Sequence, residues 1–199
     1  MSKHQQLPPL LEFLWAFVGL VLTIAGTLVE VSVTEAPWQW GNDGVQVRSL
    51  GVTYQIGAVL LVGCMGGKTA AAVSQIAYLS LGLMWLPVFG KGGGWGYIWE
   101  PTFGYLLGFV PGAWLCGWLA FRQRPRLESL AWSCACGLIV IHLVGFTYLC
   151  LIHAVKGSWF DGSLVRDLLL YSWQPLGGQI VLACMVAGIA LFLRKVLFY

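Results

Sequence analysis

Long apolar runs, separated by short polar segments, dominate the pattern of the chain. A membrane-spanning helix needs about 20 mostly apolar residues. Six windows approach or exceed this length, at about residues 10–29, 50–66, 69–87, 102–121, 127–153 and 176–197. The first window is longer than the apolar core of a signal peptide, and no convincing cleavage site follows it before Glu30. The pattern predicts an all-α fold. We expect residues 1–199 to form a single membrane domain with six transmembrane helices.

Composition supports a lipid environment for these helices. Hydrophobic residues make up 58% of the chain and charged residues only 10%, whereas soluble domains have about 25% charged residues. So few charges cannot cover a water-soluble globule of this size, so we expect the lipid bilayer as the surrounding medium. A dispersed net charge of +3 gives no indication of nucleic-acid binding.

Basic residues predict the orientation, because cytoplasmic loops are enriched in Lys and Arg. Six spans with an inside N-terminus place seven basic residues in the cytoplasm, against four outside. The segment 122–126, with three arginines, is the strongest single signal. We therefore expect both termini in the cytoplasm, outer loops at about 30–49, 88–101 and 154–175, and an integral protein of a bacterial-type plasma membrane.

The outer loops carry most of the aromatic and flexible residues. One loop contains Trp38 and Trp40, and another is the glycine-rich run from Lys91 to Tyr97. In the third, Leu164, Leu168 and Tyr171 recur at helical spacing, which predicts a short interfacial helix.

The apolar windows offer little chemistry for catalysis. Apart from charged residues near their ends, the windows contain only two histidines, His142 and His153; we expect His142 to be a hydrogen-bonded core residue and His153 to lie at an interface. The six cysteines lie in apolar stretches without CxxC spacing, which favours buried structural thiols over a metal or disulfide framework. No hydrolase, phosphate-loop or dinucleotide motif is present. We expect neither an enzyme nor a bound cofactor.

Small and uncharged polar residues mark possible contacts between the helices. Gly104, Gly108 and Gly112 recur every four residues, which places them on one helix face and predicts close helix packing. Polar residues near the predicted outer ends are Thr53, Tyr54, Gln55, Thr102, Tyr105, Gln174 and Gln179. Inside a membrane each needs a partner, and both bonding between helices and a shared ligand pocket remain open.

Several of these segments form a longer signature. They are Val52-Thr-Tyr-Gln55, Gln75-Ile-Ala-Tyr78, the stretch from Gly82 to Phe89, and Gly94-Trp-Gly-Tyr-Ile-Trp-Glu-Pro-Thr-Phe-Gly-Tyr-Leu-Leu-Gly-Phe109. Together they resemble the BioY family, the biotin-specific substrate-binding (S) components of energy-coupling-factor (ECF) transporters. The resemblance covers about residues 50–122, with weaker agreement through the last two windows.

The resemblance implies a six-helix bundle whose biotin pocket opens outward beneath the Trp38/Trp40 loop and the 91–97 loop. Gln55, Tyr78, Phe89, Pro101, Thr102, Gly104 and Tyr105 match family motif positions, and Lys91, Tyr97 and Gln179 complete the predicted substrate-binding set. Aromatic walls suit the fused rings and chain of biotin, and amide and hydroxyl groups suit its ureido edge. With no nucleotide-binding motif in the chain, uptake would rely on a transmembrane coupling subunit with ATPase subunits.

The chain departs from the family pattern in two places. Gln179 and Leu182 stand where the family usually has an Asp and, three residues later, a Lys; Gln179 remains able to hydrogen-bond a solute. In the first helix an AxxxA face for the coupling subunit is replaced by a stripe with Ala16, Gly19 and Thr23. We expect these three, with Gly108 and Gly112, to pack against partner helices. The alternatives are an S component for another vitamin or precursor, transport without partners, or a membrane enzyme or assembly factor.

Overall fold

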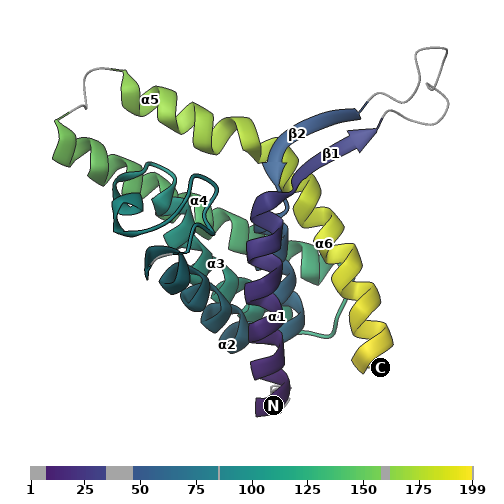
Figure 1. The fold of residues 1–199 in the computed structure, drawn as a ribbon. Coiled ribbons are helices and arrows are strands. Elements are labelled where there is room, and N and C mark those ends of the chain that lie inside the picture. The colour runs from purple at the N-terminus through teal and green to yellow at the C-terminus, as the bar shows by residue number, and fades with distance from the viewer. Residues whose placement is uncertain (1–7, 35–46, 85, 158–161, 199) are drawn as a thin grey trace.

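The computed structural model describes residues 8–34, 47–84, 86–157 and 162–198. Helices make up most of this part of the chain, joined by one short strand pair (Figure 1). The elements in order are α1 (Pro9–Leu28), β1 (Glu30–Thr34), β2 (Val47–Thr53), α2 (Gln55–Met84), the 3₁₀ helix η2 (Trp95–Trp99), α3 (Phe103–Ala120), α4 (Leu127–Lys156), α5 (Ser163–Leu168), the π-helical turn η3 (Leu169–Trp173) and α6 (Gln174–Phe198).

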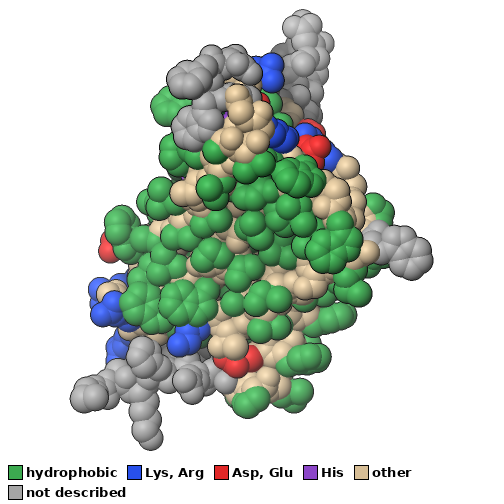
Figure 2. Space-filling model, turned by 90° about the vertical axis from the view of Figure 1, so that its left-hand side faces the viewer, with side chains coloured by type: hydrophobic (Ala, Val, Ile, Leu, Met, Phe, Trp, Pro, Cys, Tyr) green, Lys and Arg blue, Asp and Glu red, His purple; other side chains and the backbone are tan. Residues whose placement is uncertain are grey.

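Five helices in the described ranges are long and apolar enough to cross a membrane. They are α1, α2, α3, α4 and the continuous helix from Ser163 to Leu197. A broad hydrophobic band covers the face seen in Figure 2, and charged side chains gather above and below it. This distribution agrees with a helical membrane bundle. The six expected windows become five helices because the second and third windows join in α2.

Helix α2 changes direction at Gly67, whose backbone is not helical (φ 76°, ψ −176°). The side-chain nitrogen Nε2 of Gln55 nevertheless donates a hydrogen bond to the hydroxyl of Tyr78 over 2.8 Å. In a straight helix these residues would lie about 34 Å apart. The two halves of α2 therefore fold back on one another, and both rest on α1: a Cβ atom at Gly19 would lie 2.8 Å from Val62 and 2.9 Å from Ser74.

The small-residue stripe of α1 lies inside the chain. Ala16 and Thr23 are buried, Gly19 touches both halves of α2, and the Thr23 hydroxyl accepts a hydrogen bond from Gln75 Nε2. Within this chain the stripe therefore packs against α2, and contact with a separate subunit stays a prediction. The exposed face of α1 instead presents Phe13 and Phe17.

The glycine stripe of α3 lies against α4 of the same chain. A Cβ atom at Gly108 would lie 2.8 Å from the carbonyl oxygen of Ile141, and one at Gly112 would lie 2.9 Å from the carbonyl oxygen of Gly137. Gly104 faces the side chain of Tyr148. The stripe thus brings two helix backbones together, as glycine-rich faces do in membranes.

The antiparallel pair of β1 and β2 departs from the all-α expectation. Glu30 pairs with Thr53 and Thr34 with Val47. Val31 and Val52 are buried and pack with Leu182 of α6, which holds the pair on the bundle. Trp38 and Trp40 lie outside the described residues. Helix α1 begins and α6 ends at one end of the molecule, and the strand pair and α5 lie at the other (Figure 1).

The predicted short helix near residue 164 is present as α5, but it continues through η3 into α6. Its repeating residues Leu164, Leu168 and Tyr171 are partly buried and pack against the core, and its position at the membrane surface stays a prediction. His153 is buried beneath α5, and its Nε2 atom lies 3.6 Å from a carboxylate oxygen of Asp167. His153 thus joins α4 to α5 inside the protein, and its interfacial depth in the membrane stays a prediction.

Candidate functional site

A chain of aromatic rings lies at the end of the bundle opposite the termini. The segment after α2 folds back so that the ring of Phe89 rests on Gly82, where any side chain would collide with it. The Phe89 ring centroid is 5.3 Å from that of Tyr78 and 4.7 Å from that of Tyr97. Phe103 continues the series, 6.3 Å from Tyr97. These predicted and neighbouring residues form one buried aromatic wall.

Polar groups hold this wall in place. The Tyr78 hydroxyl accepts a hydrogen bond from Gln55 and donates one to the carbonyl oxygen of Val88 over 3.0 Å. The hydroxyls of Tyr97 and Thr102 share a bond of 3.1 Å. Four residues of the predicted binding set are therefore bonded in pairs, and the loop after α2 is tied to both α2 and the start of α3.

A second polar group links α3, α4 and α6. Nε2 of His142 donates to the side-chain oxygen of Gln179 over 2.7 Å, and the His142 ring meets Tyr105 edge to face at 5.7 Å. The hydroxyls of Tyr105 and Ser172 lie 2.6 Å apart. Tyr105 belongs to the same buried cluster as Tyr78, Phe89 and Tyr97, so the two groups adjoin.

Lys91 is paired across the loop that carries it. Its Nζ atom lies 3.1 Å from a carboxylate oxygen of Glu100 and 5.7 Å from the ring centroid of Tyr171. The hydrogen bond to Glu100 raises the pKa of Lys91 above its ordinary value. The lysine therefore remains charged and connects the glycine-rich loop to η3, although half of its side chain is exposed.

Two members of the predicted set have other surroundings. Gly104 is in contact with Tyr148 of α4, so it serves helix packing. Pro101 is half-buried immediately before α3. Sequence reasoning did not include His142 or Ser172 in the set. The available signal for His142 was that it is one of two histidines in the apolar windows.

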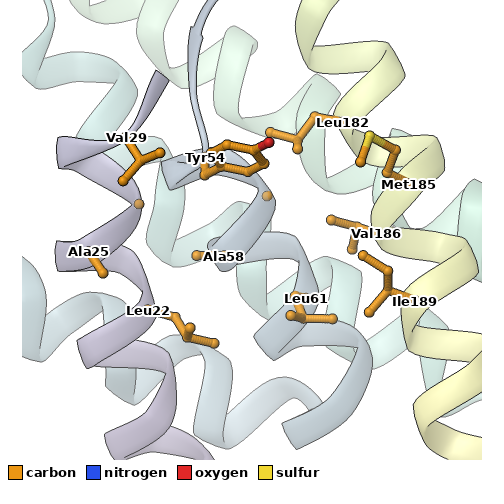
Figure 3. Close-up of a pocket in the computed structure, with 12 residues that line it drawn as sticks. Leu22, Ala25, Val29, Tyr54, Ala58, Leu61, Leu182, Met185, Val186 and Ile189 are labelled. Atoms are coloured by element: carbon orange, nitrogen blue, oxygen red, sulfur yellow. The ribbon is translucent and has the colours of Figure 1, made fainter. Parts of the chain in front are cut away.

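Two apolar hollows lie beside these groups. The first, about 310 Å³, lies between α1, the first half of α2 and α6, and the side chains around it are almost entirely hydrocarbon (Figure 3). The second, about 670 Å³, lies between α4, η3 and α6, with His142 and Ser172 in its wall. None of the predicted binding residues lines either hollow. Their walls suit acyl chains or apolar side chains better than a polar solute.

Related proteins match this chain in sequence over much of its length. An uncharacterised 21.2 kDa protein of Cyanophora paradoxa is 26% identical, covering 92% of this chain and 95% of its own length. The probable biotin transporter BioY of Lysinibacillus sphaericus is 38% identical over 59% of this chain and 66% of that protein. The biotin transporter BioY of Thermotoga maritima is 35% identical over 55% of this chain and 70% of that protein.

A solved structure and a family model extend the match to nearly the whole chain. The crystal structure of the S-component for biotin from an ECF-type ABC transporter aligns with a TM-score of 0.66 and 20% identity, covering 98% of this chain and 95% of that one. This likeness establishes a shared fold. The model of the BioY family matches residues 4–198, and the chain therefore belongs to the BioY family.

Proposed function

We propose that this protein captures biotin on the outer side of the membrane, as the substrate-binding component of an ECF-type uptake transporter. Membership in the BioY family, relatives named as biotin transporters and the fold of a biotin S-component support this proposal. Since these named relatives are transporters, the role we assign is binding and not a chemical reaction.

The observation that carries the proposal is the convergence of aromatic and uncharged polar groups at one end of the bundle. Phe89, Tyr97 and Tyr105 share one buried cluster, and Gln55 and Gln179 approach it from α2 and α6. The rings would contact the fused rings and aliphatic chain of biotin. The amides and hydroxyls would bond its ureido group, because a few placed polar groups fix a ligand among apolar walls.

His142 gives Gln179 a defined orientation in this proposal. The Gln179 side-chain oxygen already accepts from His142, so its NH₂ group is left to donate. A ureido oxygen or a carboxylate accepts such bonds. Lys91 sits at the rim, and its charge is shared with Glu100; it would attract the carboxylate of the solute before the solute is buried.

We place the protein in the plasma membrane as one domain with six passes, counting the two halves of α2 separately. Basic residues 122–126 would face the cytoplasm together with both termini, as the positive-inside tendency favours. A coupling subunit would meet the exposed face of α1 around Phe13 and Phe17, and ATPase subunits would act through it.

Titration calorimetry with biotin on the purified full-length protein tests the proposal. We expect saturable binding at micromolar biotin or below. Gln179→Leu should weaken binding about tenfold, the effect of one lost hydrogen bond of about 1.4 kcal/mol. Gln174→Leu is the matched control, because Gln174 is exposed near the start of the same helix. No binding at micromolar biotin, or equal losses in both variants, would contradict the proposal.

A second candidate keeps the fold and changes the solute. It is favoured by Leu182, which is buried against Val31 and Val52 at a position where the family usually carries a lysine. Without that cation, a neutral vitamin or precursor would fit better than a carboxylate. Mass spectrometry of small molecules that co-purify with the protein distinguishes the two: biotin in the bound fraction excludes this candidate.

A further inference from the structure

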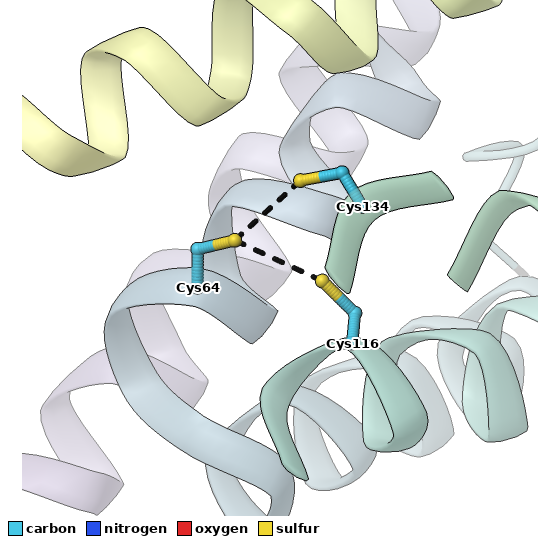
Figure 4. A group of neighbouring side chains, drawn as sticks. All are labelled: Cys64, Cys116 and Cys134. Atoms are coloured by element: carbon cyan, nitrogen blue, oxygen red, sulfur yellow. Dashed lines mark hydrogen bonds between the residues drawn. The ribbon is translucent and has the colours of Figure 1, made fainter. Parts of the chain in front are cut away.

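Three cysteines from three helices meet in the core of the bundle. Cys64 of α2, Cys116 of α3 and Cys134 of α4 are each fully buried, and their side chains point toward one another (Figure 4). The sulfur of Cys64 lies 3.8 Å from that of Cys116 and 3.5 Å from that of Cys134. All three sulfurs lie within 4.8 Å of one another. Residues distant in the sequence thus form one compact trithiol cluster.

The spacing matches a planar three-thiolate metal site. A cation bonded to three sulfurs at about 2.3 Å in one plane holds those sulfurs about 4.0 Å apart. The two separations from Cys64 lie close to this value, and the third is at most 4.8 Å, so side-chain adjustments of less than about 1 Å would complete the triangle. The helix backbones already stand in place.

The surroundings select the kind of cation. Leu60, Met65 and Leu130 are buried around the cluster. Among the described residues, the potential ligands that lie close enough to share one ion are these three thiols, with no histidine or carboxylate. Zinc ordinarily takes four ligands in a structural site. Soft thiolates in an apolar setting, with three-fold geometry, favour Cu(I).

The charge of such a site would be partly offset by one buried cation nearby, Arg194. Metal binding requires thiolates: one Cu(I) forms three Cu–S bonds, three S–H bonds break, and three protons leave to solvent. Copper stays in the +1 state, and the site changes from neutral to a net charge of −2. Arg194 is buried at the same end of the bundle and donates to the carbonyl oxygen of Ala120, four residues after Cys116. A buried cation nearby stabilises thiolates.

We propose that Cys64, Cys116 and Cys134 form a buried site for one Cu(I) ion, which ties α2, α3 and α4 together. The site is separate from the proposed solute site: Cys64 follows Gln55 by nine residues, or about 14 Å along the helix. Copper binding and biotin binding are therefore independent measurements.

Competition with a chromogenic Cu(I) chelator tests the site. The full chain, purified in detergent under anaerobic reducing conditions, is titrated against the Cu(I)–bicinchoninate complex. We expect it to withdraw one Cu(I) per chain and to develop ultraviolet thiolate-to-copper absorption. X-ray absorption should find three sulfur atoms at about 2.3 Å.

Variants of the two cysteine sets decide whether the cluster is responsible. Cys136, Cys150 and Cys184 also carry free thiols, so the triple serine variant of these three should keep both the stoichiometry and the affinity. Cys116→Ser should bind at least ~100-fold more weakly, since even an outer-shell change can have that effect.

Three results would overturn the proposal: no copper withdrawn by the full chain, copper lost in the triple variant, or copper fully retained in Cys116→Ser. Circular dichroism and gel filtration in detergent check the folding of every variant independently of biotin binding. Should Cys116→Ser not fold, the triple variant still decides the question, because its only remaining thiols are the three of the cluster.

Discussion

The hydroxyl of Tyr78 is in contact with three segments at once. It accepts from Gln55, donates to the carbonyl of Val88, and lies 3.4 Å from the hydroxyl of Thr27. Without this hydroxyl the Gln55 amide and the Val88 carbonyl would lose these hydrogen bonds, whereas the Thr27 hydroxyl also donates to the carbonyl oxygen of Thr23. Gln75 shows the contrast, because among the described residues its buried side-chain oxygen has no hydrogen-bond partner.

Replacing Tyr78 by Phe should lower the free energy of unfolding by about 1–3 kcal/mol, because the carbonyl of Val88 and the amide of Gln55 lose their partner. Denaturant-induced unfolding in detergent measures the difference. Tyr54→Phe is the control, because Tyr54 immediately precedes Gln55 and is partly exposed. Removing its hydroxyl should change the free energy of unfolding by less than about 0.5 kcal/mol. Equal effects of the two changes would contradict this account.

Sequence reasoning could select many of these residues singly but could not pair them. Gln55 and Tyr105 stand out as polar groups near helix ends, and Tyr78 was selected through the family resemblance. The contact between His142 and Gln179 joins positions 37 apart on different helices. Hydrophobic periodicity along each helix does not predict where two helices cross. The cysteine cluster was missed for the same reason, because its members have no common spacing along the chain.

Glycine determines how the helices meet. Gly67 permits the reversal of α2, and Gly108 allows the backbone of α3 to touch that of α4. Hydropathy predicted the apolar helices that contain or adjoin these glycines: Gly108 lies in the fourth window, and Gly67 lies between the second and third. The strand pair did not, because Val31 and Val52 adjoin long apolar runs and their alternation spans only a few residues.

Gly108→Ala should destabilise the protein by about 1–3 kcal/mol, as an added methyl does in a tightly packed core. Its Cβ atom would lie 2.8 Å from the carbonyl oxygen of Ile141 and 2.9 Å from the Ile141 Cα atom, neither of which can rotate away. Gly188→Ala in α6 is the matched control, since no atom lies within 4 Å of its added Cβ. It should be neutral or stabilising by up to about 1 kcal/mol. Thermal unfolding curves of both variants check the difference.

Gly67→Ala should destabilise the protein by about 1–3 kcal/mol for a different reason. Its added Cβ meets nothing closer than 3.7 Å, but its φ of 76° and ψ of −176° belong to a region that is essentially restricted to glycine. Circular dichroism during thermal unfolding measures the loss. Gly177→Ala, also without close neighbours and without a positive φ, should show no comparable loss.

The whole molecule is polarised along the bundle. The aromatic and amide groups gather beside the strand pair, whereas Arg194 and the segment after α3 lie toward the end where α1 begins. Hydropathy and charge predicted this polarity because both depend on composition along the chain. The shape of the solute site could not be predicted, since it depends on how the loop of residues 86–102 folds onto α2 and α3.

Labelling with a membrane-impermeant maleimide tests the orientation. A cysteine at Gly96, in η2, should react in intact cells, whereas one at Gln123, between α3 and α4, should react only after lysis. Both positions are exposed, so access to them differs by side of the membrane and not by burial. The unmodified chain gives the background from its native thiols. The reverse pattern would contradict the proposed topology.

The reversal of α2 also determines how far a solute would travel on capture. From Gln55 to Gly66 the first half has 12 residues, a rise of about 18 Å, whereas the hydrocarbon layer is about 30 Å thick. With Gly67 at the inner boundary, a molecule resting against Gln55 would already lie roughly 12 Å below the outer boundary. Loading alone would thus cover about 12 Å of the roughly 30 Å layer, and energised release would still have to open the remaining distance of about 18 Å.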